Sequence, residues 1–199
     1  MKSLSLSKPH IVIIVGIPGA GKSYFADYFS DTFNAPLISL DKISKKLFGH
    51  RTFNEKEKSI LARISGHFID ELLKTKQTIV LDGLSETRTD RQAIAKKAHQ
   101  EGYETLLVWV QTESAAAKNR VVKAAKGQAP IMTTEQFDSA LKRFSPPHTL
   151  EKAVVISGKH THASQLKIVL GRLVTSRAEL PISTVVPQRT NAHQKILIR

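Results

Sequence analysis

Five short apolar runs recur along the chain, and segments with helical spacing separate them. The runs are predicted to form β-strands at residues 10–15, 35–39, 77–81, 103–110 and 153–157. The first run, Ile11-Val12-Ile13-Ile14-Val15, is apolar at every position, which is typical of a central parallel strand covered on both faces. Because strands and helices alternate five times, we expect an α/β fold, a three-layer sandwich with a five-stranded parallel sheet.

The segments between the runs are predicted to be helices. Several of their ends carry residues that typically begin or end a helix: Asp41, Asn54 and the pair Thr133 and Gln136 are predicted N-terminal caps, and Gly49 ends the second helix. The predicted helices cover residues 22–33, 41–48, 54–74, 87–101, 114–126, 133–144 and 160–174.

Two of these helices carry patterns that predict how they pack. In the first helix the aromatic residues are expected to be core side chains and not a base-stacking platform; they are Tyr24, Phe25, Tyr28 and Phe29. In the helix at 54–74, one apolar face is predicted; it consists of Ile60, Ile64, Phe68 and Leu72 and is flanked by Leu61 and Ile69.

The turn between the first strand and the first helix has the composition of a phosphate-binding loop. It reads Gly16-Ile17-Pro18-Gly19-Ala20-Gly21-Lys22-Ser23, a P-loop between a buried strand and a helix N-terminus. Its glycines let backbone N–H groups point at an anion, and Lys22 adds a mobile positive charge for the terminal phosphates. We therefore predict that these residues, apart from Ile17, bind ATP and that the Ser23 hydroxyl ligates Mg²⁺.

Two aspartates follow predicted strands and are the candidate carboxylates of the site. Asp41 comes after the strand at 35–39, and Asp82 comes directly after the strand at 77–81. The carboxyl ends of parallel strands lie at one edge of a sheet, so both should lie beside the P-loop. Asp82 has the form of a Walker-B strand end and is predicted to act near Mg²⁺. One of the two should orient or deprotonate an acceptor hydroxyl, and the pattern does not distinguish which; alternatively, Asp41 is only a helix cap.

A basic segment follows the fourth strand, where a small kinase has its lid. It contains four cations within nine residues: Lys118, Arg120, Lys123 and Lys126. Arg120 is predicted to contact the phosphates of ATP and to take part in catalysis, because a guanidinium can bridge two phosphate oxygens. The alternative is a solvated basic helix face.

Length and composition indicate one globular domain, predicted at residues 1–174, with a flexible basic tail at 175–199. The chain has 199 residues and no cysteine, which excludes disulfides and thiolate zinc sites. A net charge of +13 suits anionic partners, namely nucleotides or nucleic acid.

The hydropathy pattern indicates where in the cell the protein is expected. No apolar run approaches the roughly 18 residues of a membrane-spanning helix, so no membrane partner is expected. Met1–Lys8 lacks the long apolar core of a signal peptide, and the expected location is the cytoplasm.

Several short elements of the sequence resemble motifs of an ATPase family, the P-loop kinases related to polynucleotide kinase and zeta toxin. Residues 39–49, S-L-D-K-I-S-K-K-L-F-G, resemble their D-x-I-R-x-x-L-x-G element. T-I-V-L-D at 78–82 with Arg91 resembles their V-I-L-D…R element, and Lys118-Asn119-Arg120 matches their lid arginine. F-S-P-P at 144–147 with Glu151 resembles their F-x-x-P…E stretch, so the similarity extends over about residues 10–174.

The resemblance implies ATP-dependent phosphoryl transfer to a hydroxyl, with Asp41 as the acceptor base and Arg120 in the lid. Arg88 and Arg91 are predicted, together with Asp41, to contact the acceptor. The chain departs from the family at Ser44, where an arginine that helps hold the acceptor of polynucleotide kinases is common. A nucleic-acid 5′ end is therefore less favoured as the acceptor.

These observations lead to three hypotheses about function. The first is a Mg²⁺- and ATP-dependent kinase acting on a hydroxyl of a small molecule or a nucleic-acid end. The second is a nucleotide-regulated nucleic-acid-binding protein with weak ATPase activity. The third is a zeta-toxin-like kinase of nucleotide sugars. ATP is preferred to GTP by default, because the chain has no guanine-specificity element of the Asn-Lys-x-Asp kind.

Overall fold

A five-stranded, all-parallel sheet forms the centre of the computed structural model, which describes residues 6, 8–49, 54–123 and 130–178. The strands are β1 (His10–Val15), β2 (Leu37–Ser39), β3 (Ile79–Asp82), β4 (Glu104–Gln111) and β5 (Val154–Ser157). Their order across the sheet is β2-β3-β1-β4-β5. The predicted α/β class with a five-stranded parallel sheet is confirmed.

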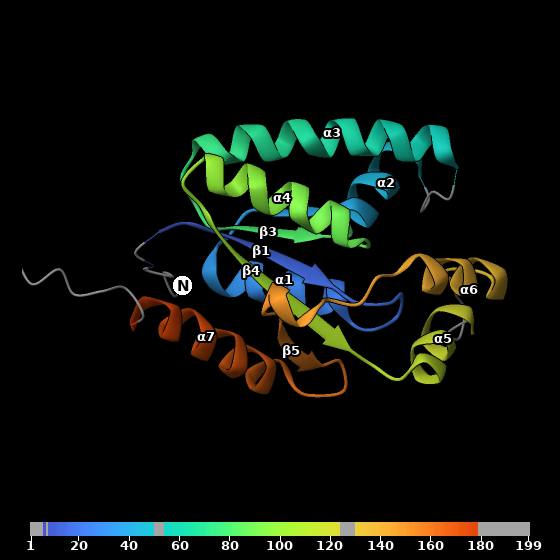
Figure 1. The fold of residues 1–199 in the computed structure, drawn as a ribbon. Coiled ribbons are helices and arrows are strands. Elements are labelled where there is room, and N and C mark those ends of the chain that lie inside the picture. Colours follow the sequence, from blue (N-terminus) through green and yellow to red (C-terminus); the bar gives the residue numbers. More distant parts are fainter. Residues whose placement is uncertain (1–5, 7, 50–53, 124–129, 179–199) are drawn as a thin grey trace, which may run out of the picture.

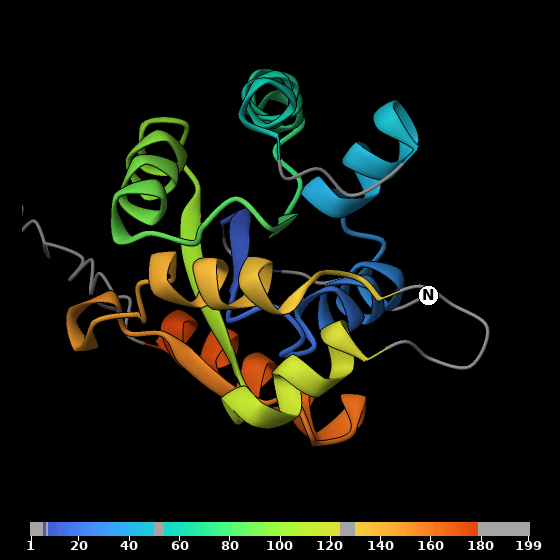
Figure 2. The same cartoon turned by 90° about the vertical axis from the view of Figure 1, so that its right-hand side faces the viewer.

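Helices cover both faces of this sheet (Figure 1). They are α1 (Lys22–Phe33), α2 (Leu40–Phe48), α3 (Glu55–Lys74), α4 (Arg88–Gln100), α5 (Ser114–Val122), α6 (Thr134–Arg143) and α7 (His162–Ala178), with a 3₁₀ turn η1 (Thr149–Glu151) before β5. Figure 1 shows α3 and α4 above the sheet and α7 below it. In Figure 2, α5 and α6, in yellow and orange, lie in front of the carboxyl ends of the strands.

The continuous apolar pattern of β1 is explained by two separate cores. Ile11, Ile13 and Val15 pack in a cluster with side chains of α3 and α4. Val12 and Ile14 point to the other face and pack in a cluster with side chains of α1 and α7. Since both faces of the central strand are buried, no position in it tolerates a polar side chain without cost.

Local capping signals hold in most places and fail at Asp41. The Asn54 side chain accepts a hydrogen bond from the Lys56 amide, and Thr133 with Gln136 forms a complete capping box. Gly49 ends α2 in a left-handed conformation with φ 76°. The N-cap of α2, however, is Ser39, and Asp41 lies within the first turn. The prediction that Asp41 caps the helix is therefore wrong.

The buried face of α3 is centred one position further along the helix than predicted, on the flanking residues Leu61 and Ile69. The buried residues are Leu61, Ser65, Ile69 and Leu73. Ile60 and Phe68, which were expected inside, are 46% and 45% exposed. Both stripes are apolar, and the stripe containing Ile69 and Leu73 is the one that packs on Ile11 and Ile13 of the sheet.

Two predicted boundaries also differ. α5 ends at Val122, and Lys126 lies outside the described residues. α7 begins at His162 and continues to Ala178, four residues beyond its expected end, while residues 179–199 of the predicted tail lie outside the described part. Among the helices that the structure describes, none has the length and apolar character needed to cross a membrane.

Candidate active site

The P-loop forms a tight turn from the end of β1 into α1. Gly19 has φ +75°, and a Cβ atom there would lie 2.2 Å from the Ala117 carbonyl oxygen, so only glycine fits beneath α5. The N-cap of α1 is Gly21, which makes no side-chain capping bond. The first N–H groups of α1 are thus not capped by a side chain, as an anion-binding helix start requires.

A second loop supports the P-loop from behind. A Cβ atom on Gly158 would lie 1.9 Å from the carbonyl oxygen of Ala20, so the loop after β5 approaches the P-loop more closely than any side chain allows. The Thr112 hydroxyl donates to the same Ala20 oxygen at 2.9 Å. Sequence reasoning missed both residues, because they lie about 90 and 140 positions from the loop that they support and belong to no motif.

Lys22 reaches back over the loop that precedes it. Its Nζ donates to the carbonyl oxygens of Gly16 at 2.9 Å and Ile17 at 3.0 Å. These contacts hold the positive charge beside the backbone of the anion-binding turn.

Asp82 ends β3 and is 3% exposed. The hydroxyl of Ser23 donates to its Oδ2 at 2.7 Å, and the hydroxyl of Ser39 donates to the same oxygen at 3.1 Å. Burial raises the pKa of the Asp82 carboxyl, while the hydrogen bond from Ser23 and the charge of Lys22 oppose this rise. Ser39 was not predicted as a site residue; its signal is its place at the end of β2, paired in register with Asp82.

The structure brings Asp41 to the same edge of the sheet. Asp41 lies in the first turn of α2, two residues after the end of β2, and β2 pairs with β3. Its negative charge contributes to the raised pKa of Asp82, so the two carboxylates are within electrostatic reach of each other. Ser23, Asp82 and Asp41 are therefore gathered on the β3 side of the P-loop.

Arg120 lies on the other side of the loop. Its Nη1 donates to the carbonyl oxygen of Gly19 at 3.1 Å, and its Nη2 donates to that of Gly158 at 3.4 Å. Gly158 follows β5, and β1 separates β4 and β5 from β3. The guanidinium thus bridges the P-loop and the β5 loop, on the side away from Asp82.

The other lid cations have different surroundings. Lys118 pairs with Asp138 of α6 at 2.8 Å and lies 5.7 Å from the centre of the Phe137 ring. It therefore connects the two lid helices. Lys123 forms the C-terminal cap of α5.

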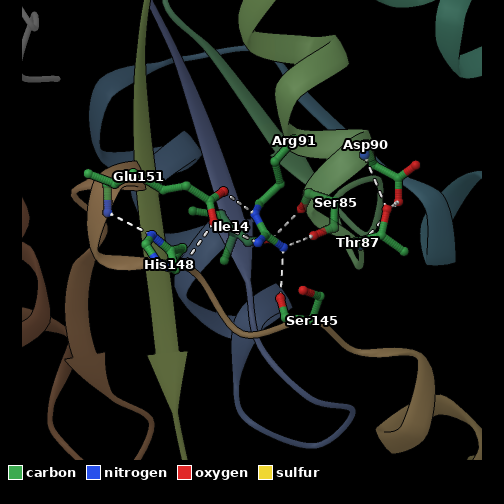
Figure 3. Close-up of polar contacts among 9 residues, drawn as sticks. Ile14, Ser85, Thr87, Asp90, Arg91, Ser145, His148 and Glu151 are labelled. Atoms are coloured by element: carbon green, nitrogen blue, oxygen red, sulfur yellow. Dashed lines mark hydrogen bonds and ion pairs between the residues drawn. The ribbon is translucent and has the colours of Figure 1, made fainter.

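Arg91 has a structural role that the sequence prediction did not anticipate (Figure 3). Its side chain is 2% exposed, and it forms a two-pronged ion pair with Glu151, at 2.7 Å from Nε and 2.9 Å from Nη2. Its Nη1 donates to the carbonyl oxygens of Ser85 and Ser145. The predicted substrate contact through Arg91 is corrected, because its donors are used inside the protein. Arg88, at the start of α4, is exposed, and its substrate contact stays a prediction.

The oxygen ligands present fit a magnesium ion. Ser23 and Asp82 offer hard oxygen atoms 2.7 Å apart. Across the described residues, no group of three or more His, Cys, Asp or Glu side chains could hold a metal by itself. Mg²⁺ binds proteins through one or two side chains and takes its other ligands from phosphate oxygens and water.

Comparison with known proteins identifies the family of the chain. The family model described as AAA domain matches residues 11–147, which include the P-loop, both aspartates and the lid. The chain belongs to the AAA domain family. No curated protein matches this AAA domain protein.

Solved structures of similar fold are kinases. A gluconokinase from Sinorhizobium meliloti 1021 superposes with a TM-score of 0.61 and 16% identity, over 84% of this chain and 93% of that chain. The APS kinase CysC of Mycobacterium tuberculosis, solved with AMPPNP and APS, has a TM-score of 0.61 and 17% identity, over 84% of this chain and 98% of that chain.

The Pnkp1/Rnl/Hen1 RNA repair complex contains a more partial match. Its TM-score is 0.58 at 19% identity, over 70% of this chain and 45% of that chain. The AAA domain protein thus has a P-loop kinase-like fold.

Proposed function

We propose that this AAA domain protein is a Mg²⁺-dependent kinase that transfers the γ-phosphate of ATP to a hydroxyl group of a small molecule. The observation that carries the proposal is the gathering of Ser23, Asp82 and Asp41 on one side of the P-loop. A phosphate-binding turn, a metal-binding oxygen pair and a second carboxylate are the parts that phosphoryl transfer requires. The kinases of similar fold support a phosphotransferase reaction.

The donor half of the site is the P-loop with Lys22. The uncapped N–H groups at the start of α1 bind the phosphate oxygens. Lys22 exchanges the carbonyl oxygens of Gly16 and Ile17 for the terminal phosphates of the donor. Ser23 and Asp82 hold Mg²⁺, which neutralises charge on the phosphate oxygens.

Asp41 is the better candidate for the acceptor base. The Asp82 carboxylate is buried, and one of its oxygens already accepts two hydrogen bonds, so it is poorly placed to take a proton from a substrate. Asp41 is partly exposed at the same edge. It accepts the proton of the acceptor hydroxyl while that oxygen bonds to the γ-phosphorus and the bond to the β–γ bridging oxygen breaks.

The surroundings of α2 favour a small acceptor. Ser44, which stands in place of the family arginine, is 2% exposed and points into the fold. The cations of this helix are exposed: Lys42, which pairs with Asp27, and Lys45 and Lys46. The names of gluconokinase and of the APS kinase solved with APS likewise indicate small-molecule substrates for those proteins.

Two substitutions test the proposal. Lys22→Ala should abolish ATP turnover, and Asp41→Asn should reduce phosphoryl transfer by about 10²- to 10⁴-fold while ATP still binds, since general base catalysis is worth that much. The measurement is transfer of label from γ-labelled ATP to a panel of 5′-hydroxyl oligonucleotides, nucleosides and a metabolite extract. Asp31→Asn, an exposed change at the far end of α1, is the matched control and should leave transfer unchanged. Full activity of Asp41→Asn would refute its role as the base.

A further inference from the structure

Three aromatic rings form a stack beside the P-loop. The ring of His162 lies 3.8 Å from that of Tyr24 and 4.1 Å from that of Tyr28, with interplanar angles of 27° and 8°. Two nearly parallel rings this close to one imidazole must lie on its opposite faces, because they would otherwise overlap each other. The order is therefore Tyr24, His162, Tyr28. The two tyrosines belong to α1, whereas His162 is the first residue of α7 and lies far from them in the sequence.

Packing alone does not account for this stack. The prediction that all four aromatic residues of α1 are core side chains is wrong at Tyr24, which is 65% exposed, whereas Phe25 and Phe29 of the same helix are fully buried. Because His162 covers one face of the Tyr24 ring, the exposed area belongs to the edges and the outer face. The Nε2 atom of His162 is buried and has no hydrogen-bond partner among the described residues. A stack that leaves a polar atom unsatisfied and an aromatic face in water calls for a functional explanation.

The position of Tyr24 indicates which part of a ligand it would meet. Tyr24 directly follows Ser23, whose hydroxyl points to Asp82 on the β3 side, where the terminal phosphate is expected. The nucleoside end of the donor must then leave toward β4 and β5. That side holds Arg120 and Gly158, and His162 begins α7 four residues after Gly158. The exposed face of Tyr24 thus borders the nucleoside side of the P-loop.

We propose that the outer face of Tyr24 stacks against the nucleobase of the donor, with His162 and Tyr28 as its backing. This rests on the proposed function, because it requires a nucleoside triphosphate in the P-loop. Stacking uses the π-face that every base has and reads no hydrogen-bonding edge. The site therefore accepts ATP and GTP with similar affinity.

Inorganic tripolyphosphate, which has the phosphates of the donor but no nucleobase, provides the test of this stacking. Binding of ATP, GTP and inorganic tripolyphosphate to the full chain is measured by calorimetry in the presence of Mg²⁺. Tyr24→Leu should weaken ATP and GTP by about 5- to 100-fold, the value of one stacked base, and leave tripolyphosphate unchanged. Tyr24→Phe keeps the stack and should match the wild type for all three ligands.

Several outcomes would overturn the inference. Unchanged ATP affinity in Tyr24→Leu, an equal loss for ATP and tripolyphosphate, or a loss confined to ATP would each contradict base-independent stacking. Failure of the proposed function gives different results: a wild-type chain that binds neither ATP nor tripolyphosphate has no nucleotide site at the P-loop, and one that binds both but transfers no phosphoryl group is not a kinase, which leaves the stacking test intact.

A second variant keeps the test decisive if Tyr24→Leu does not fold. Tyr24→Trp should show fluorescence quenching by ATP and GTP beyond that of the wild type, whose single tryptophan is Trp109. Tripolyphosphate should not produce this quenching. Equal signals from ATP and tripolyphosphate would refute the stacking.

Discussion

Asp82 illustrates how a functional side chain is held at a cost to stability. Two serine hydroxyls donate to one of its oxygens, yet burial still raises the pKa of its carboxyl. A raised pKa means that the folded protein holds the proton more tightly than the unfolded chain does. The folded state is then favoured most at low pH, and this advantage is lost as the pH rises through the folded pKa. At neutral pH the charged Asp82 therefore destabilises the fold.

Asp82→Asn should separate activity from stability. The amide oxygen still accepts hydrogen bonds from Ser23 and Ser39, but the charge is gone, so the free energy of unfolding at pH 7 should rise. The gain should shrink as the pH falls toward the acid range, where the wild-type carboxyl is protonated. Phosphoryl transfer should drop by at least about 10- to 100-fold, the loss that is usual when only an outer partner of a metal ligand is altered. Urea unfolding between pH 4 and 8, with Asp31→Asn as control, checks this; a less stable Asp82→Asn at pH 7 would contradict it.

α3 shows that an amphipathic helix can carry two apolar stripes. Either stripe satisfies the helical period, and they differ in direction by about 100° around the axis. The buried one includes Leu61, Ile69 and Leu73, while Ile60 and Phe68 remain about half exposed. Which stripe faces inward depends on the sheet beneath, where Ile11, Ile13 and Leu81 form one core with Ile69.

The same substitution on the two stripes gives a matched comparison. Ile69→Ala should lower the free energy of unfolding by about 2 to 5 kcal/mol, because it removes buried methyl groups and leaves a cavity. Ile60→Ala removes the same atoms from a half-exposed position and should change it by about 0.5 kcal/mol or less. Denaturant unfolding of both variants measures the difference. Equal losses would show that the outer stripe is also packed.

The Arg91–Glu151 ion pair connects segments of the molecule that are far apart in the sequence. Arg91 lies in the first turn of α4, and Glu151 is the last residue of η1. The Ser145 carbonyl oxygen, which also accepts a hydrogen bond from Arg91, lies two residues after the end of the lid helix α6. The loop after β3 joins them through Ser85. One buried side chain therefore connects the strand that bears Asp82 with the end of the lid.

Glu151→Gln should weaken this connection in a pH-dependent way. The hydrogen bond from Arg91 lowers the pKa of Glu151, so the wild type gains stability above the ordinary range of glutamate and loses it as the pH falls through the folded pKa. At pH 7 the variant should lose about 3 kcal/mol, because the Arg91 charge is left buried without its partner. The two unfolding curves should converge in acid.

Glu86→Gln is the matched control for that experiment. Glu86 pairs with Arg143 at 4.0 Å on the surface, where both side chains are about half exposed. Such pairs contribute about 1 kcal/mol or less. A loss from Glu151→Gln no larger than that of the control would show that the buried pair does not stabilise the fold.

The net charge of +13 is a property of the whole chain that still predicts an anionic partner. Arg91 and Lys118 are paired with acidic side chains within the fold, so the excess of positive charge comes from other cations. Nucleic-acid binding stays a prediction, and so does the role of residues 179–199.

The sequence by itself determined the features that depend on neighbouring residues. The P-loop, the capping residues Asn54 and Thr133 and the two-faced apolar run of β1 were all predicted, since each arises from contacts within a few positions or from a strict repeat. The parallel order of strands then placed Asp41 and Asp82 at one edge.

Tertiary structure alone decided which of several equivalent local choices was used. Arg91 meets Glu151 60 residues away, Ser39 meets Asp82 43 residues away, and Tyr24 of α1 stacks on His162 of α7. In each case the local pattern allows more than one environment for the side chain. The free energy of burial and of long-range hydrogen bonds selects among them, and those partners are not encoded near the residue that they control.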